Sequence, residues 1–169
     1  MVRGFTLLEL LITVSIVTLM LAFAAPSYRQ VNQQIKMTAL ANDLHGFFMQ
    51  AKSEAVFRNQ GLWVHIEGMP SNTGEWQLRL SSDALLPSNE ESNISVFSGA
   101  RYRNLSVNHT SSINSVRFDH VMGNPTQNGS ITIKAHVEDS QGIRVILHNR
   151  AGRIKVCTIE GDQYGFSSC

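Results

Sequence analysis

The sequence predicts an α+β fold in which one long N-terminal helix packs on an antiparallel sheet. Residues 5–25 form an almost unbroken apolar run, and residues 27–58 carry apolar side chains at three- and four-residue spacing. Both patterns are typical of helices. Beyond residue 59 the chain contains short segments in which apolar and polar side chains alternate, as strands do. With 169 residues, the chain is long enough for one modest core beyond the apolar segment.

The apolar run Phe5–Ala25 is long enough, at about 21 residues, to span a bilayer as a helix. Glu9 is its one charged residue, and an acid inside such a run usually has a partner. A position at headgroup level is the alternative, because Glu9 lies only about one turn inside the run. A cleaved secretory signal is also considered, but the run exceeds the usual h-region and "AFAA" is the nearest cleavage site.

The helix is expected to continue to about residue 58, with an interruption at Pro26, because proline removes a backbone donor. Its second half is amphipathic, and its apolar stripe is predicted to pack on the sheet. The stripe consists of Leu40, Leu44, Phe47, Phe48, Ala51 and Ala55.

Six segments alternate with a period of two and are predicted strands. They read "LWVHIE", "WQLRL", "ISVF", "SVRFD", "SITIKAHV" and "IRVIL". "GMPSNTG" is predicted to close a hairpin, "GNPTQNG" and "DSQG" are further turns, and residues 81–93 are an exposed loop.

No pattern in the sequence indicates an enzyme. The six histidines share no metal-ligand spacing, and neither an activated nucleophile nor a phosphate-binding glycine loop is present. We therefore expect neither a catalytic residue, nor a metal, nor a cofactor. The two cysteines, Cys157 and Cys169, could be free thiols, but a late pair in a membrane-targeted chain favours one disulfide.

The stretch "RGFTLLELL" resembles the signal of type IV prepilins and type II secretion pseudopilins. This resemblance implies that a prepilin peptidase cuts between Gly4 and Phe5 and methylates the new amine. Residues 1–4 would then be a leader peptide and residues 5–25 the transmembrane and filament-core helix. The Glu9 carboxylate would neutralise the Phe5 ammonium of a neighbouring subunit and fix the axial register.

"LANDLHGFFMQAKSEAVFRNQ" is similar to a segment of GspH/FimT-type minor pilins, in which "AKSEA" is the matching core. The resemblance implies a type IV pilin fold, with residues 26–58 as an amphipathic helix and residues 59–169 as a periplasmic β-rich domain. It also implies a single pass through the bacterial inner membrane, followed by incorporation into an extracellular pilus. The implied partners are other major and minor pilins, prepilin peptidase and the inner membrane.

Although the formal net charge is only +1, positive charge is concentrated near the C-terminus. "GRIK" resembles the GRxR tail motif of FimT-type pilins that bind DNA during natural transformation, with Lys155 replacing the second arginine. The candidate contacts to double-stranded DNA are Arg144, Arg150, Arg153 and Lys155.

Three alternatives to DNA binding stay open. The charged side chains of the segment with Arg153 and Lys155 could simply be solvated, or could pair with Asp139, Glu160 or a neighbouring subunit. FimU-type tip pilins carry a similar "AGRI" turn without a proven DNA role, and a GspH-like secretion pseudopilin is the third possibility. A second cluster, "ARYRN", is predicted as an edge strand, with base stacking on Tyr102 as its functional alternative.

Overall fold

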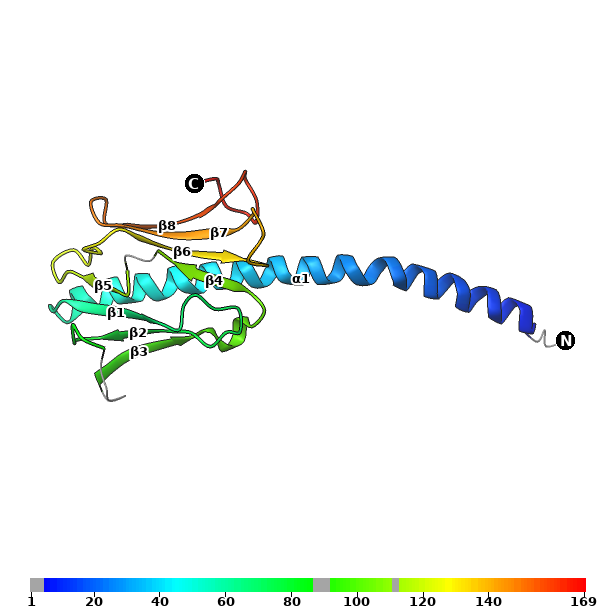
Figure 1. Cartoon of the computed structure of the whole chain (residues 1–169), viewed down its shortest axis with the longest axis horizontal. Helices are drawn as coiled ribbons and strands as arrows, with labels where there is room; N and C mark the ends of the chain where they lie inside the picture. The colour runs from blue at the N-terminus through cyan, green and yellow to red at the C-terminus, as the bar shows by residue number, and fades with distance from the viewer. Residues whose placement is uncertain (1–4, 87–91, 111–112) are drawn as a thin grey trace. The chain divides into compact units, whose positions relative to one another are not determined.

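The computed structural model describes residues 5–86, 92–110 and 113–169, except for the side chains of residues 23–27 and 29. The chain divides into two compact units, residues 1–35 and residues 36–169, which are described separately below. Helix α1 (Leu7–Phe57) begins in the first unit and ends in the second (Figure 1).

In the first unit, α1 is capped at its start, and between Leu7 and Leu21 it presents apolar side chains on all sides. The Oγ1 atom of Thr6, just before the helix, accepts a hydrogen bond from the Glu9 N–H at 3.2 Å, which is the first half of a capping box. The hydroxyls of Thr13, Ser15 and Thr18 donate to backbone carbonyls one turn earlier. The described large apolar side chains up to Leu21 are 49–78% exposed.

Helix α1 passes through Pro26 without a break, so the predicted interruption at Pro26 is wrong. A proline removes one backbone donor, and a helix of 51 residues retains its other hydrogen bonds on both sides of that position. Among the described residues, no helix combines the length and the hydropathy that a membrane span requires. The predicted span 5–25 includes positions 23–25, whose side chains lie outside the described residues.

The described residues of the second unit include eight strands, which form two four-stranded antiparallel sheets that run alongside the C-terminal half of α1 (Figure 1). Sheet A has the order β3-β2-β1-β5, and sheet B has the order β4-β6-β7-β8. The strands are β1 (Leu62–Glu67), β2 (Gln77–Ser81), β3 (Asn93–Ser98), β4 (Ser106–His109), β5 (Ser115–Phe118), β6 (Gly129–Lys134), β7 (Ile143–His148) and β8 (Arg153–Thr158).

The core lies between the helix stripe and the inward faces of both sheets. All six predicted stripe residues are buried; Met37 extends the stripe toward the N-terminus, and Ala41 lies within it. From the strands, alternate residues such as Val64, Leu80 and Val145 are fully buried. The prediction of an α+β fold with a long helix packed on antiparallel strands is therefore confirmed, including the hairpin loop at residues 68–74, but the strands form two sheets where one was predicted.

The segment "ARYRN" is not an edge strand, because Gly99–Tyr102 form a short 3-10 helix, η2. The Ser98 side chain caps η2 by accepting a hydrogen bond from the Ala100 N–H. Tyr102 is consequently buried, and its hydroxyl donates a hydrogen bond to the Asp43 carboxylate on α1. A ring held in this way cannot serve as a base-stacking platform.

Tyr102 should make the domain sensitive to alkaline pH. Burial, and then the hydrogen bond to Asp43, raise the pKa of Tyr102 to about 12. The unfolded chain therefore loses this proton near pH 10 while the folded chain retains it, so stability should fall as pH rises from about 10 to 12. In urea titrations, Tyr102→Phe should make the free energy of unfolding less dependent on pH in this range. Some dependence should persist, because burial also raises the pKa of Tyr164.

The same variant should lose about 1–2 kcal/mol at neutral pH through the missing hydrogen bond. Tyr28→Phe, at an exposed tyrosine, is the control and should leave both quantities unchanged. An identical slope in Tyr102→Phe and the unmodified chain would contradict this account.

Candidate functional site

The predicted N-terminal site lies at the start of α1. Gly4 is outside the described residues, Phe5 is 70% exposed, and Glu9 is exposed in the first turn of the helix. A carboxylate there is favourable, because the partial positive charge at a helix N-terminus attracts it. The Glu9 side chain makes no hydrogen bond or ion pair with a described residue, so its carboxylate is available to another chain.

The strand register brings three of the four predicted cations onto the outward face of sheet B. Directly opposed residues of an antiparallel pair share a face, and Arg144 opposes Cys157 while His148 opposes Arg153. Lys155 lies two residues beyond Arg153 on β8, about 6.6 Å along the strand, and therefore on the same side. We call the outward residues Arg144, His148, Arg153 and Lys155 the basic face. Arg150 lies in the β7–β8 turn next to it and is exposed.

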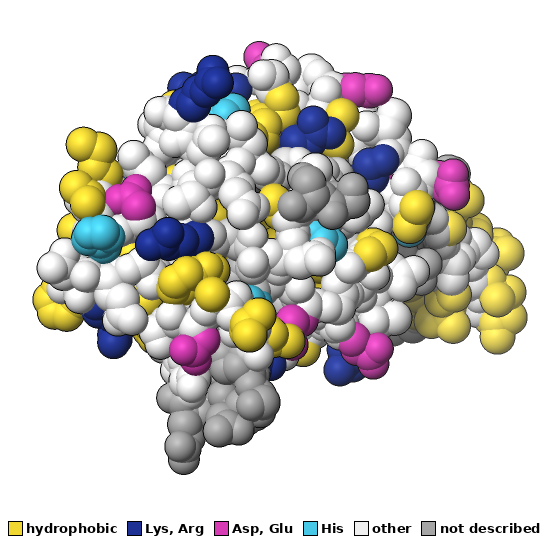
Figure 2. Space-filling model, turned by 60° about the vertical axis from the view of Figure 1, so that its left-hand side comes forward, with side chains coloured by type: hydrophobic (Ala, Val, Ile, Leu, Met, Phe, Trp, Pro, Cys, Tyr) yellow, Lys and Arg dark blue, Asp and Glu magenta, His cyan; other side chains and the backbone are white. Residues whose placement is uncertain are grey.

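Within the described part of the chain, no ion pair neutralises the basic face. The two salt bridges found there join Arg58 to Glu54 and Arg79 to Glu67, far along the sequence from β7 and β8. The Nε atom of Arg144 is buried and makes no hydrogen bond to a described residue. Figure 2 shows Lys and Arg side chains along the upper part of the molecule, where β7 and β8 lie in Figure 1.

The two acids that sequence analysis offered as internal partners make other contacts. Asp139 accepts a hydrogen bond from the His136 N–H at 2.8 Å, and Glu160 accepts one from the Ser140 hydroxyl at 3.1 Å. The alternative that these acids pair with the basic strand is therefore not realised in the described residues. Pairing with a neighbouring subunit stays open.

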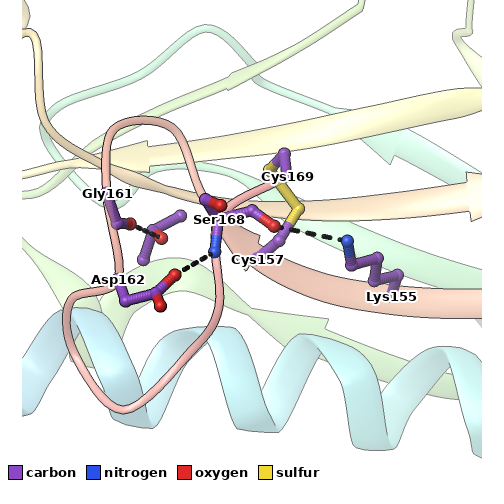
Figure 3. The surroundings of a disulfide bond; sticks show 7 residues. Lys155, Cys157, Gly161, Asp162, Ser168 and Cys169 are labelled. Atoms are coloured by element: carbon purple, nitrogen blue, oxygen red, sulfur yellow. Dashed lines mark hydrogen bonds between the residues drawn. A yellow bond between two sulfur atoms is a disulfide. The ribbon is translucent and has the colours of Figure 1, made fainter.

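A disulfide joins Cys157 to Cys169 and holds the C-terminal segment beside β8 (Figure 3). The two Cα atoms are 5.0 Å apart. Lys155 Nζ lies 3.4 Å from the Ser168 carbonyl oxygen, and Asp162 accepts a hydrogen bond from the Ser168 N–H at 2.8 Å. The C-terminal segment thus lies next to the basic face, and its contact with Lys155 limits the positions of that side chain.

The β7–β8 turn, residues 149–152, is attached to the rest of the domain by side chains. Lys52 Nζ on α1 donates hydrogen bonds to the Gly152 carbonyl at 2.8 Å and to Asn124 Oδ1 at 3.2 Å. Asn128 Oδ1 accepts a hydrogen bond from the Asn149 N–H at 2.9 Å. These contacts fix the loop from which Arg150 projects.

Asn124 belongs to a loop organised by one carboxylate. Asp119 accepts hydrogen bonds from the N–H groups of Val121, Met122 and Asn124, each at 2.8 Å. These bonds, led by the one from Met122, hold the pKa of Asp119 below its usual value.

Sequence analysis missed the roles of Thr6 and Lys52. The signal for Thr6 was present, because Thr-x-x-Glu at the start of an apolar run is the spacing of a capping box. No comparable signal exists for Lys52, whose contact with Gly152 spans 100 residues of sequence. Among the described residues, no group of three or more His, Cys, Asp or Glu side chains is placed to hold a metal ion.

Two family models match parts of this chain. A family model described as type II transport protein GspH matches residues 40–152, and one described as the prokaryotic N-terminal methylation motif matches residues 1–25. No curated protein matches the chain.

Two crystal forms of the type IV minor pilin FimU of Pseudomonas aeruginosa PAO1 have similar structures. One has a TM-score of 0.59 and 16% identity, covering 81% of this chain and 96% of that one. The other has a TM-score of 0.56 and 16% identity, covering 76% and 94%. At this identity the likeness concerns the fold alone.

The disulfide should contribute about 3 kcal/mol to stability, because it closes a loop of 12 residues in the unfolded chain. Cys157→Ser/Cys169→Ser should lower the free energy of unfolding by about that amount in denaturant titrations. The matched control is the unmodified chain measured with and without reductant, which should reproduce the difference. Equal stability of the two chains under oxidising conditions would refute this contribution.

Proposed function

This chain belongs to the GspH family of minor pilins and pseudopilins, and we propose that it is a minor type IV pilin incorporated at the tip of a pilus. Proteins of this family are structural and not enzymatic. The N-methylation motif implies processing by prepilin peptidase and assembly with other pilins. It also implies residence in the inner membrane before incorporation.

The observation that carries the proposal is the surface of α1 in the first unit. A helix that is apolar all round is stable only when lipid or other helices cover it. The described apolar side chains from Leu7 to Leu21 are at least 49% exposed, and the hydroxyls between them are satisfied by their own backbone. Such a surface suits transfer from a membrane to the core of a filament.

FimU, which has the same fold, is a type IV minor pilin, and the choice of a pilus over a secretion pseudopilus is made on that analogy. A deletion strain tests this choice by two independent measurements, surface piliation and the amount of exported enzymes. Loss of pili with normal export is expected. Loss of export with normal pili would instead favour the GspH-like pseudopilin.

Glu9→Gln should prevent incorporation while leaving the domain folded. The glutamine keeps the shape of the side chain but leaves the Phe5 ammonium of the adjoining subunit without a counter-charge. A buried charge that loses its partner costs about 3–5 kcal/mol, so the amount in sheared pili should fall by roughly a hundredfold or more. Immunoblots of the sheared and membrane fractions measure it.

Glu75→Gln, which removes an exposed acid of the second unit, is the matched control and should incorporate normally. Normal incorporation of Glu9→Gln would exclude the pairing of Glu9 with Phe5 as the determinant of register.

A second function, binding of double-stranded DNA, is favoured by the basic face. The charges of Arg144, Arg153 and Lys155 lie on one side of sheet B, and the described acids do not neutralise them. Arginine can also form two parallel hydrogen bonds to a phosphate. Contacts of this kind attach to the DNA backbone without reading sequence.

Arg150→Ala/Arg153→Ala/Lys155→Ala should abolish DNA binding by the full chain in detergent micelles. In the unmodified chain, affinity should fall with salt, with a slope of log K against log salt of about 0.9 for each phosphate contacted. Fluorescence anisotropy with a labelled duplex, titrated at several salt concentrations, measures both quantities.

The matched control, Lys36→Ala/Arg101→Ala/Arg103→Ala, removes three exposed charges elsewhere. It should bind as the unmodified chain does. Loss of binding in the control alone would move the site to the "ARYRN" cluster, and no binding at low salt by the unmodified chain would leave pilus assembly as the function.

A further inference from the structure

Lys52 occupies a place where three segments of the second unit meet. Its ammonium on α1 contacts the Gly152 carbonyl of the β7–β8 turn and the Asn124 side chain of the loop after β5. The loop also packs on the lysine backbone, since a Cβ atom added to Gly123 would lie 2.5 Å from the Lys52 carbonyl oxygen. The lysine therefore joins helix, loop and turn.

Gly152 shows how closely the turn approaches that junction. Its φ of +58° is in the left-handed region that favours glycine, and an added Cβ atom would lie 2.1 Å from Asn124 Oδ1. Arg150 and Arg153 flank this glycine on the two sides. Any movement of Gly152 away from Lys52 consequently changes the relative position of the two arginines.

We propose that Lys52 is a positioning residue of the basic face, which holds the β7–β8 turn so that Arg150 and Arg153 meet the phosphates of one DNA backbone together. This inference rests on the DNA-binding function proposed above. Lys52 itself is half-buried, and two of its three N–H donors already have acceptors inside the domain. It acts on DNA through the arginines and not by contacting a phosphate.

The first measurement is hydrogen exchange of the protein in the absence of DNA. Hydrogen exchange of the amides at residues 149–154 is followed in full-length chain in detergent micelles. Lys52→Met keeps the aliphatic stem but removes the ammonium, so exchange of these amides should be about tenfold faster or more. Lys52→Arg retains donors and should restore slow exchange.

Lys36→Met is the matched control, because it removes the same charge from an exposed position on the same helix. It should leave exchange at residues 149–154 unchanged. Should Lys52→Met prevent folding, Asn124→Ala removes only one acceptor of the ammonium and should give a smaller acceleration at the same amides. Unchanged exchange in the folded Lys52 or Asn124 variant overturns the proposal.

The second measurement is duplex binding at several salt concentrations, with the same set of variants. At a given salt concentration, Lys52→Met should weaken DNA binding about tenfold, because the turn must then be ordered on binding. The slope of log K against log salt should not change, because every phosphate contact is retained. Arg153→Ala, in contrast, should lower the slope by about 0.9. Lys36→Met should alter neither quantity.

The outcomes separate this proposal from the function on which it rests. Binding by the unmodified chain that Lys52→Met leaves unchanged would overturn the positioning role alone. A salt slope that falls in Lys52→Met as it does in Arg153→Ala would make Lys52 a direct phosphate contact and overturn it too. Absence of binding by the unmodified chain would refute the DNA function, and the positioning role with it.

Discussion

Burial of the α1 stripe by both sheets is the constraint on which the second unit depends. The stripe alternates large side chains such as Phe48 with small ones such as Ala51 and Ala55, all fully buried. Small residues allow strands to approach the helix closely, and large ones fill the space between the two sheets. Because the residues on the inward face of each strand pack against the helix, the residues on the outward face can be charged without destabilising the core.

The basic face results from this separation of inward apolar and outward polar residues, together with the register in which β7 pairs with β8. A shift of the β7–β8 pairing by one residue would turn Arg153 and Lys155 inward and expose Ile154 and Val156. Burial of the apolar residues therefore selects the register, and the register gathers charges that are up to eleven residues apart in the sequence, from Arg144 to Lys155. The turn needs its own support, because its sequence contains no apolar side chain large enough to anchor it.

The sequence allowed prediction of those features that a local pattern encodes. The stripe and six of the strands follow from the period of the apolar residues, and the disulfide follows from two cysteines placed late in a membrane-targeted chain. Strand β4 lacks clear alternation, and only its pairing with β6 makes it a strand. The contact of Tyr102 with Asp43 and the contact of Lys52 with Gly152 join segments that are 59 and 100 residues apart. No local pattern records such contacts.

Between Thr6 and Leu21, the helix of the first unit satisfies its hydroxyl groups internally and leaves one carboxylate available. Thr13, Ser15 and Thr18 direct their hydroxyls to their own helix, and Thr6 accepts the Glu9 N–H. In an apolar environment, hydrogen bonds satisfied within the helix give no specificity toward a neighbouring helix, which could then slide along the surface. Among the described residues of this segment, the Glu9 carboxylate alone offers an unsatisfied charge. In the proposed pilin, one charge at a fixed height would give a uniform apolar surface a defined axial position in the filament.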